Sequence, residues 1–422
     1  MIVYLGKIYA LGKAIYNLII FVYSKLIFSA SFFNAKAKKW VAGRLIFPNF
    51  NFSEKTIWMH CASLGEFEQG RPVLESLKKN YPNYKIVLSF YSPSGYEVRK
   101  NYPVADKVIY LPVDTEANAA KLVQQINPAL VIWVKYEFWF HYLKELKKNN
   151  IPVLLISGIF RKSQPFFKWY GGIWKKILHC FDVVFVQNQS SAFLLSNSID
   201  QEKIIISGDT RFDRVTAIAN HKTSIERIEK SILHKKVLVA GSTWKEDETL
   251  LLSITKQHPE LLFIIVPHEV NANNISRIQQ MFERSILFSE LKETDAVDSL
   301  PNILIIDSIG LLSSLYQYAD ITYVGGGFNK GIHNILEAAV YGKPVIFGPK
   351  YEKFSEAVSL TELGGAVSIK NVDELKAIVQ LLMDSESERQ MMSKASLKFV
   401  YKNTGATELI VNYIAENRLL HN

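Results

Sequence analysis

The sequence predicts two α/β domains, each a doubly wound parallel β-sheet covered by helices on both faces. Three observations predict this fold class. Short apolar runs with the length of strands alternate with helical stretches along most of the chain, and 422 residues exceed what one hydrophobic core usually serves. The composition, with 48% hydrophobic and 21% charged residues, is that of a globular protein.

The first half of the chain contains seven predicted strands. They are residues 56–62, 85–90, 107–111, 130–134, 153–157, 183–187 and 204–207. Predicted helices begin near Glu66, where the helical stretch continues to Asn80, and near Gly95. Strands that are joined through helices run parallel, so these elements are expected to form one sheet with helices on both faces.

The second half repeats the pattern, with strands predicted at residues 236–240, 262–266, 303–306, 321–324, 345–347 and 366–369. The charged stretch 214–236 lacks strand signals and marks the junction, which gives a first domain over 45–215 and a second over 216–400. Residues 401–422 are expected to pack back toward the first domain as a helix. Ligands of such sheets bind at the carboxyl ends of the strands, so the domains are expected to face each other across a cleft.

The N-terminal segment, residues 1–44, is apolar and basic. All of its charged residues are basic: Lys7, Lys13, Lys25, Lys36, Lys38, Lys39 and Arg44. The longest central run without a charge, residues 14–24, is shorter than the ~20 residues that a membrane span needs. We therefore predict a helix on the membrane surface, with apolar side chains at the acyl boundary and lysines on the headgroups. A core helix over the first domain and a tilted span are the alternatives.

The net charge is +9, from 49 basic and 40 acidic residues. Such an excess suits nucleic acid, anionic lipid or a phosphorylated substrate, or serves solubility alone. Its concentration near the N-terminus favours the lipid. The two cysteines, Cys61 and Cys180, lie in apolar runs and are expected to be buried, which indicates a reducing compartment rather than a disulfide framework or a zinc site.

Residues 321–348 form the most informative segment of the second half. An apolar strand runs into three glycines, 325–327, whose missing side chains let the backbone turn and approach a ligand. A helix is expected to begin near His333 and Asn334, with Glu337 one turn inside. Its N–H groups suit a phosphate and the carboxylate suits a ribose diol, so the segment favours a nucleotide. The alternative is an ordinary glycine turn with a solvated glutamate.

The matching segment of the first half is residues 63–66, which follow the first predicted strand. This turn delivers Glu66 to a helix N-terminus, where the helix dipole favours the ionised carboxylate and prepares it to act as a base. An acid that only complements the dipole is the alternative. From the residues alone, the two interpretations remain open.

Six segments resemble the bacterial transferases of 3-deoxy-D-manno-oct-2-ulosonic acid (Kdo). Residues 63–66 are similar to their S-V-G-E motif, 92–95 to T-P-T-G, 137–139 to E-L-W, 208–213 to G-N-L-K-F-D, 241–243 to A-G-S-T, and 331–337 to G-G-H-N-x-x-E. A G-K-P-V-x-F-G stretch follows. The matches occur in the same order and cover essentially the whole chain.

The resemblance implies a glycosyltransferase of the GT-B architecture with two Rossmann-like domains. It would move Kdo from CMP-Kdo to the lipid A precursor, lipid IVA, with inversion, in lipopolysaccharide core biosynthesis at the cytoplasmic face of the inner membrane. Glu66 matches the family's proposed catalytic base. The donor would be held by Gly241, Ser242, Thr243, His268, Gly331, His333, Asn334 and Glu337, and the acceptor by Ser63, Gly65, Glu137 and Arg211.

No metal or other cofactor is expected, because a CMP-sugar leaves as a monophosphate that helix N-termini and Arg211 can stabilise. The acidic run 246–248 is interpreted as a set of helix-capping residues. Two departures from the family pattern stand out. Residues 267–271 (PHEVN) replace P-R-H-P-E-R, so a family arginine near the nucleotide has no direct counterpart and His268 is a candidate substitute. Arg211 replaces a lysine, which keeps the charge but changes a point donor into a fork.

Two other functions remain as alternatives. A transferase or epimerase that acts on a UDP-sugar would share Glu337 and the sugar-nucleotide site, but it gives no reason for residues 63–66. A basic nucleic-acid binder would explain the charge, but no recognised reader motif accompanies it, so no nucleic-acid partner is expected. Residues 166–176 mix aromatic side chains with lysines and form either a second membrane contact or an amphipathic core helix.

Overall fold

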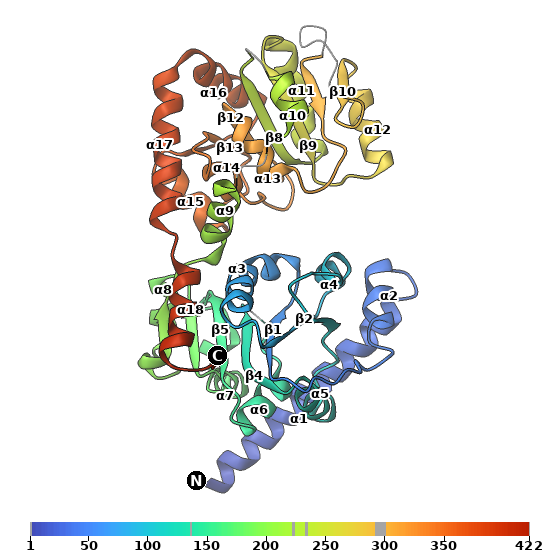
Figure 1. Cartoon of the computed structure of the whole chain (residues 1–422), viewed down its shortest axis with the longest axis vertical. Coiled ribbons are helices and arrows are strands. Elements are labelled where there is room, and N and C mark those ends of the chain that lie inside the picture. The colour runs from blue at the N-terminus through green and yellow to red at the C-terminus, as the bar shows by residue number, and fades with distance from the viewer. Residues whose placement is uncertain (1, 136, 222–223, 233–234, 292–300, 422) are drawn as a thin grey trace. The chain divides into compact units, whose positions relative to one another are not determined.

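The computed structural model describes residues 2–135, 137–221, 224–232, 235–291 and 301–421, with side chains from residue 11 onward (Figure 1). The chain divides into two compact units. The first consists of Met1–Arg214 together with Thr404–Asn422, and the second consists of Val215–Asn403. Each unit contains one seven-stranded sheet in which every pairing is parallel, so the predicted α/β class with two doubly wound sheets is confirmed.

The sheet of the first unit has the strand order β3-β2-β1-β4-β5-β6-β7. Its strands are β1 (Thr56–Cys61), β2 (Lys85–Phe90), β3 (Lys107–Tyr110), β4 (Pro128–Val134), β5 (Val153–Gly158), β6 (Val183–Val186) and β7 (Ile204–Ile206). The chain winds outward from β1 to β3 and then returns to β4 on the other side of β1. The direction of winding therefore reverses between β1 and β4, which is where doubly wound sheets bind ligands.

Helices cover both faces of this sheet. They are α3 (Leu64–Asn80), α4 (Pro93–Arg99), α5 (Glu116–Ile126), α6 (Phe140–Lys148), α7 (Gly172–Leu178) and α8 (Gln189–Leu195), with short 3₁₀ turns η1 (Pro165–Phe167) and η2 (Gln201–Lys203). Helix α9 (Thr210–Asn220) begins in the first unit and continues into the second. Neighbouring strand residues enter different cores, because successive side chains point to opposite faces: Trp58 joins the cluster under α5 and α6, and Met59 joins the one under α3. Burial on both faces explains why the central strands are almost wholly apolar.

The sheet of the second unit has the order β10-β11-β9-β8-β12-β13-β14. Its strands are β8 (Val237–Thr243), β9 (Leu262–Pro267), β10 (Ser285–Leu287), β11 (Ile303–Ile305), β12 (Ile321–Val324), β13 (Val345–Phe347) and β14 (Ala366–Ser368). The winding reverses between β8 and β12. The surrounding helices are α10 (Glu226–Ser231), α11 (Lys245–Gln257), α12 (Ala272–Met281), α13 (Leu312–Leu315), η4 (Tyr316–Tyr318), α14 (Leu336–Ala339), α15 (Ser355–Glu362), α16 (Val372–Asp384) and α17 (Glu386–Lys402).

The N-terminal segment forms a long helix, α1 (Ile2–Ala30), and a short one, α2 (Ala35–Ala42). Within α1, Leu11–Ala30 has the length and mean hydropathy, 1.4, of a membrane span. The expectation that this segment is too interrupted to qualify is wrong by that measure, because its two lysines lie near its ends and leave the hydropathy of the stretch high. Figure 1 shows α1 running along the first unit past α7 and α6.

One face of α1 is fixed to the first unit by polar contacts. The Tyr16 hydroxyl donates to Asp114 at 2.5 Å, Lys13 pairs with Glu116 at 2.6 Å, and the His141 ring donates to the Asn17 side chain at 2.7 Å. Large apolar side chains occupy much of the remaining surface of the helix, among them Leu18, Ile19, Phe21, Leu26 and Phe28, all at least half exposed. The helix is thus held along its length and still presents an apolar face.

The last helix, α18 (Ala406–Glu416), belongs to the first unit. Ile410, Val411 and Ile414 join the core cluster under α3. The carboxylate of Asp213, on α9, accepts hydrogen bonds from the backbone N–H groups of Gly405 and Thr407, each at 2.6 Å, and so caps α18. Both cysteines are free thiols, but only Cys61 is buried. The expectation that Cys180 is buried is wrong, because it follows the end of α7 near the surface.

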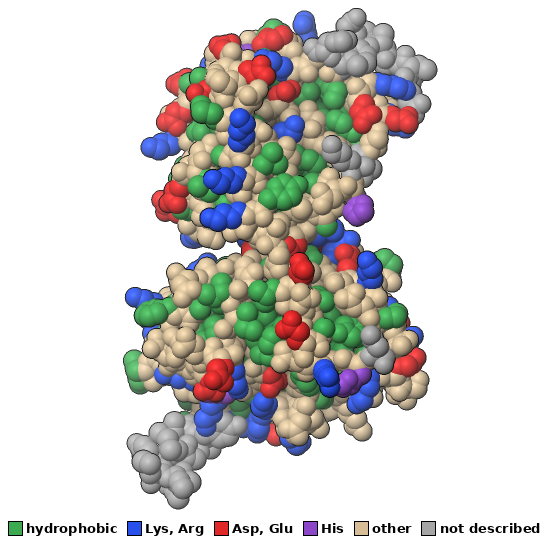
Figure 2. Space-filling view, turned by 60° about the vertical axis from the view of Figure 1, so that its left-hand side comes forward, with side chains coloured by type: hydrophobic (Ala, Val, Ile, Leu, Met, Phe, Trp, Pro, Cys, Tyr) green, Lys and Arg blue, Asp and Glu red, His purple; other side chains and the backbone are tan. Residues whose placement is uncertain are grey.

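Basic side chains are prominent at one edge of the first unit. In the view of Figure 2, several Lys and Arg side chains gather along its lower edge. Aromatic residues 169 and 170 add to the exposed surface: Trp169 is 96% exposed and Tyr170 is 57% exposed. The neighbouring Phe166 is buried in the core instead, so residues 166–176 combine a core element with an exposed aromatic turn.

Candidate active site

The residues predicted to bind substrates fall into two groups, one in each unit. Ser63, Gly65, Glu66 and Glu137 follow β1 and β4, at the winding reversal of the first sheet. In the second unit, β8 and β12 flank the winding reversal of the sheet. The other group lies at the ends of these strands and of β9: Gly241, Ser242 and Thr243 end β8, His268 follows β9, and Gly331, His333, Asn334 and Glu337 follow β12. Because the carboxyl ends of adjacent parallel strands lie at one edge, each group is brought together by the topology of its own sheet.

Glu66 lies in the first turn of α3 and is 9% exposed. Its carboxylate accepts a hydrogen bond from the backbone N–H of Ala62. Ser63 is the N-cap residue, but its side chain makes no capping hydrogen bond. The carboxylate therefore satisfies a backbone donor at the start of the helix, and it is also held at the edge of the sheet where a ligand would bind.

Gly65 has no steric partner that requires a glycine. A Cβ atom built there would meet only the Ser63 hydroxyl, at 4.0 Å. Among the described residues, no other atom outside the neighbouring backbone lies within 4 Å of that position. The space beside Gly65 is therefore open.

Glu137 lies three residues beyond β4, and its side chain is 21% exposed. Its Oε2 atom accepts hydrogen bonds from the Trp139 indole at 3.1 Å and lies 3.2 Å from His60 Nε2. Burial raises the pKa of Glu137 to about 8, and the Trp139 hydrogen bond and the charge of Arg44 oppose this only in part. The carboxyl group is therefore largely protonated at neutral pH.

A hydrogen-bond chain behind Glu137 fixes the orientation of His60. The Trp58 indole donates to Ser89 Oγ at 2.8 Å, and Ser89 Oγ lies 2.9 Å from His60 Nδ1. Because an indole N–H only donates, Ser89 Oγ accepts from Trp58, and its own hydrogen can reach either His60 Nδ1 or the Met59 carbonyl oxygen at 3.5 Å. The other ring nitrogen of His60, Nε2, faces Glu137. Burial lowers the pKa of His60 to about 3, so the ring is neutral. Sequence analysis did not identify His60 or Ser89; the only signal was a polar residue inside each apolar strand.

Arg211 is paired within the first unit. Its guanidinium contacts Asp209 Oδ2, from Nε at 2.9 Å and from Nη2 at 2.7 Å. The same aspartate approaches the Gln69 side chain, one turn along α3 from Glu66, at 3.5 Å. Arg211 thus lies near the first half of α3, and its charge is paired with that of Asp209. The role of Arg211 in binding an acceptor stays a prediction.

The glycines of the second unit are required by other parts of the backbone. A Cβ atom on Gly325 would collide with the carbonyl oxygen of Ser242, and one on Gly327 would meet the Gly348 backbone at 2.6 Å. Gly241 leaves room for the ring of Tyr316, a residue that the motif did not identify. Contacts within the protein therefore explain Gly325 and Gly327, without the predicted close approach of a ligand.

The helix expected from His333 is much shorter than predicted. Helix α14 spans only Leu336–Ala339, and Glu337 lies in its first turn rather than one turn inside. The reason is that residues 326–335 form a turn, closed by a hydrogen bond of 3.1 Å from the His333 N–H to the Gly325 carbonyl. Asn334 then links both parts, accepting from the Leu336 N–H at 3.2 Å and donating to Glu337 Oε1 at 3.1 Å.

Three aromatic rings stack beside this turn. His268 packs against both Trp244 and His333, with ring centroids 4.7 Å and 4.2 Å from its own, and the Trp244 and His333 centroids lie 6.3 Å apart. The Trp244 indole donates to His333 Nε2 at 2.9 Å, which puts the ring hydrogen of His333 on Nδ1. Burial lowers the pKa of His333 to about 4, and that of His268 also lies below its usual value because of burial. Both predicted histidines are therefore neutral hydrogen-bonding groups, and Trp244 is the partner that sequence analysis missed.

Ser242, which precedes this stack, has a backbone φ of +53°. A serine in the left-handed region is uncommon, and such conformations gather at functional sites. Asp247 supports the same loop by accepting from the N–H groups of Trp244 and Gly326, each at 2.9 Å, and from the Tyr323 hydroxyl at 2.7 Å. The capping interpretation of the acidic run is confirmed for Asp247. Within the described residues, no group of three or more His, Cys, Asp or Glu side chains is arranged to hold a metal ion.

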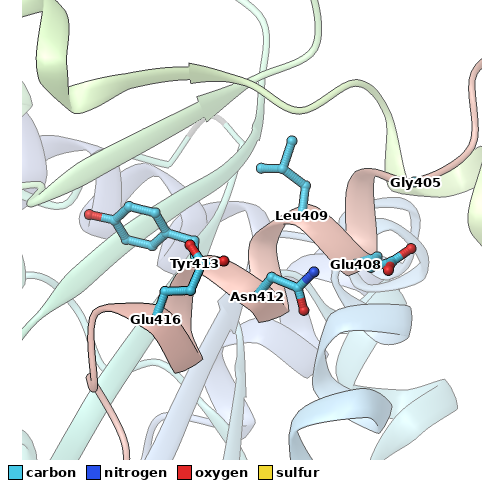
Figure 3. A pocket seen from close by; sticks show the side chains of 6 residues that line it. All are labelled: Gly405, Glu408, Leu409, Asn412, Tyr413 and Glu416. Atoms are coloured by element: carbon cyan, nitrogen blue, oxygen red, sulfur yellow. The ribbon is translucent and has the colours of Figure 1, made fainter.

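A shallow hollow of about 410 Å³ on the outer side of α18 does not belong to either group. Its lining residues are Gly405, Glu408, Leu409, Asn412, Tyr413 and Glu416 (Figure 3). Helix α18 and its N-cap residue Gly405 supply all of them, and none was predicted as a site residue. The hollow contains no basic group for a phosphorylated substrate.

The comparison with protein families identifies the first unit. The model described as "3-Deoxy-D-manno-octulosonic-acid transferase (kdotransferase)" matches residues 39–214. The 3-deoxy-D-manno-octulosonic acid transferase of Haemophilus influenzae is 26% identical over 381 residues, which cover 85% of this chain and 86% of that protein. The corresponding transferase of Chlamydophila psittaci is 25% identical over 357 residues, covering 82% of this chain and 81% of that protein.

A bifunctional glycosyltransferase/methyltransferase of Fusobacterium nucleatum is 29% identical over 368 residues. The match covers 81% of this chain but only 54% of that protein, about half its length. Among solved structures, the UDP-GlcNAc 2-epimerase of Neisseria meningitidis has a TM-score of 0.61 at 18% identity, with 86% of this chain and 100% of that chain covered. The MurG protein of Acinetobacter baumannii has a TM-score of 0.53 at 12% identity, with 86% and 99% covered.

The two structural similarities show the fold, which is the GT-B architecture, and the transferase relatives extend over both units. The first unit matches the 3-deoxy-D-manno-octulosonic acid transferase model, relatives described by that name extend over both units, and the chain is a glycosyltransferase similar to them.

Proposed function

We propose that the protein transfers Kdo, with inversion, from CMP-Kdo to a hydroxyl group of the lipid A precursor. The observation that carries this proposal is residues 63–66 at the winding reversal of the first sheet, with Glu66 at the edge of that sheet and open space beside Gly65. The similarity to these transferases supports the sugar, and the motif supports the role of Glu66.

In the proposed step, the acceptor hydroxyl oxygen attacks the anomeric carbon of Kdo. A new carbon–oxygen bond forms, the bond from that carbon to the phosphate oxygen breaks, and CMP leaves with the bonding electrons. The hydroxyl proton passes to the Glu66 carboxylate, which acts as a general base. A positioned base of this kind contributes roughly 10²–10⁴-fold to the rate.

The second unit is proposed to hold the CMP group. Two neutral histidines and the Asn334 amide supply hydrogen-bonding groups for the phosphate and base, and Glu337 supplies a carboxylate for the ribose diol. The family's arginine near the nucleotide has no direct counterpart in this chain, and His268 packs against both Trp244 and His333. Donor binding is therefore expected to depend on the stack rather than on a guanidinium group.

The protein is further proposed to work on the cytoplasmic surface of the inner membrane. Lys13, Tyr16 and Asn17 tie α1 to side chains of the first unit, and these contacts would have to break if the helix crossed a bilayer. An attached helix with an exposed apolar face suits a surface position. A phosphorylated, acylated acceptor is presented at the same surface.

The test is a transfer assay with purified protein, a lipid A precursor in micelles, and CMP-Kdo, UDP-GlcNAc or no donor. Product mass analysis should detect one or more added Kdo residues with CMP-Kdo alone. Kdo transfer that is undetectable while UDP-GlcNAc is consumed would reject this proposal in favour of a UDP-sugar enzyme.

A further inference from the structure

A cavity of about 520 Å³ lies in the first unit between the two N-terminal helices and the ends of β1, β2 and β4. Its volume is within the ~300–1,000 Å³ typical of ligand sites. One wall comes from α1 and is formed by Tyr23, Ile27 and Ala30. The opposite wall comes from the sheet and includes Ser63, Ser92 and Glu137. Two predicted acceptor residues therefore share a cavity with the N-terminal helix.

The two walls differ in chemistry. The helix wall is largely apolar and lies on the same helix as the exposed Leu26 and Phe28, so apolar surface continues from the cavity to the outside of α1. The sheet wall carries hydroxyl and carboxyl groups. Glu137 is oriented there by the neutral ring of His60, and Trp139 packs on Tyr91 with ring centroids 4.4 Å apart. A ligand with an apolar part and a hydroxylated part would match both walls.

A third feature favours an anionic group on the same ligand. Trp40 lines the cavity, is only 7% exposed, and its indole N–H has no hydrogen-bond partner among the described residues. A buried donor without a partner costs about 1–3 kcal/mol, which a ligand acceptor atom would recover. Helix α2 also carries Lys36, Lys38 and Lys39 without an acid, and Lys36 lines the cavity.

The corner that holds Trp40 is rigid. The guanidinium of Arg44 lies 4.0 Å from the Trp40 ring and donates to the carbonyl oxygens of Leu111, Trp40 and Tyr91, at 2.9, 3.1 and 2.7 Å. Arg44 thus ties the end of α2 to the ends of two strand segments. The cavity is consequently a prepared site and does not need to be opened by its ligand.

We propose that this cavity binds the acceptor glycolipid where its first acyl chain joins the phosphorylated sugar. The chain lies against Tyr23, Ile27 and Ala30, and the sugar contacts Ser63, Ser92 and Glu137. The inference rests on the proposed function and adds where the acceptor lies. The sugar then ends beside Ala62, whose N–H holds the Glu66 carboxylate.

The kinetic test compares a substitution inside the cavity with one in the other unit. Ile27→Trp adds bulk inside the cavity, whereas Leu363→Trp adds bulk at a side chain that is 58% exposed and outside the lining. Ile27→Trp should raise KM for the acylated acceptor about tenfold with kcat within about twofold, and leave KM for the deacylated sugar phosphate unchanged. Leu363→Trp should change neither value by more than about twofold. Equal effects on both acceptors, or from both substitutions, would overturn the acyl-chain assignment.

A binding test separates this inference from the transfer reaction. The probe is a phosphorylated glucosamine lipid with a photoreactive diazirine near the carboxyl end of its acyl chain, used without CMP-Kdo. Labelled peptides should come from residues 23–40, and Ile27→Trp should reduce the labelling at least about fivefold. Labelling confined to other segments, or equal labelling by a plain diazirine fatty acid, would contradict the proposal. If the probe labels residues 23–40 of a protein that does not transfer Kdo, the proposed function is rejected and the cavity assignment is retained.

Discussion

The carboxylate of Glu66 is held at the edge of the first sheet by the Ala62 N–H, and the base role rests on its charge. Glu66→Gln keeps the shape of the side chain but removes the proton acceptor. We expect kcat to fall by about 10²–10⁴-fold while the affinity for CMP stays unchanged, because the nucleotide residues belong to the other unit. Steady-state rates and calorimetric titration with CMP measure the two quantities.

Glu68→Gln is the matched control for this substitution. Glu68 lies two residues along α3 and pairs with Arg99 at 2.7 Å and with Arg71 at 3.8 Å. Both changes remove one negative charge from the same helix. A Glu68 variant as inactive as the Glu66 variant would show that the loss reflects charge on α3 and not a base.

Glu137 gives the stability of the protein a particular dependence on pH. A carboxyl group with a raised pKa in the folded state stabilises the fold below its unfolded pKa, and the contribution is lost as pH rises toward about 8. His60 acts in the opposite direction, because its lowered pKa of about 3 costs stability only as pH falls below about 6.5. Between pH 6.5 and 8, therefore, only Glu137 of these two residues makes the free energy of unfolding depend on pH.

In that pH window, the free energy of unfolding of Glu137→Gln should fall less steeply with pH than that of the unsubstituted protein. The difference in slope is at most about 1.4 kcal/mol per pH unit, the value for one proton. Urea unfolding at half-unit intervals measures it. Parallel curves for the two proteins would mean that Glu137 ionises normally in the fold.

The indole N–H of Trp244 is expected to matter for the donor. Trp244→Phe keeps a ring in the stack but removes the hydrogen bond to His333. A net hydrogen bond of about 0.5–1.5 kcal/mol predicts CMP binding weaker by roughly two- to tenfold. Trp169→Phe is the control, since that ring is 96% exposed. Calorimetry that finds the same loss in both variants would remove His333 orientation as the cause.

Residue types alone indicated several members of the site but not their partners. His60 and Ser89 face each other because β1 and β2 pair with that register, and no local pattern in the sequence specifies a parallel register. Likewise Trp244, Tyr316 and Trp40 acquire their positions from segments far away in the chain. The motif residues were predictable because each follows a strand at a glycine or polar turn.

At the scale of elements, the central strands were predictable because parallel strands buried on both faces are written as continuous apolar runs. Strand β10 was missed: it has three residues, lies at the edge of its sheet, and is only half-buried throughout. Helix α14 was predicted too long because the apolar residues after the glycine turn have helical spacing. The first of them, Ile335, belongs to the loop and not to the helix. Local pattern fails where a loop and a helix compete for the same residues.

Helix α1 allows a prediction about membrane binding. Leu18 and Leu26 are 61% and 65% exposed on the helix. Replacing both with Asp should reduce cosedimentation with anionic lipid vesicles several-fold, because two charges on the apolar face oppose insertion at the interface. The control replaces Phe193 and Ile309, exposed to 67% and 86% on other elements, with Asp. A similar loss in the control would reassign the contact away from α1.

At the scale of the whole molecule, the chain leaves the first unit after Arg214 and re-enters it at Thr404. Asp213 binds the backbone N–H groups of Gly405 and Thr407 at this point, so one carboxylate ties the departing and returning segments. Asp213→Ala removes a helix cap and should lower the free energy of unfolding by about 0.5–2 kcal/mol. Denaturant unfolding of Asp200→Ala, an exposed aspartate outside any such clamp, should differ from the unsubstituted protein by less than about 0.5 kcal/mol.

The tie at Asp213 also describes how the chain is assembled from parts. Residues 215–403 are an insertion in the sequence of the first unit. The segments on either side of the insertion remain in contact, because Asp213 Oδ1 accepts from the Gly405 N–H at 2.6 Å. A short linker from Arg214 to Thr404 would join two segments that the Asp213 side chain already holds together. A protein linked in this way would carry helix α1, the cavity beside it and Glu66, and would lack Val215–Asn403.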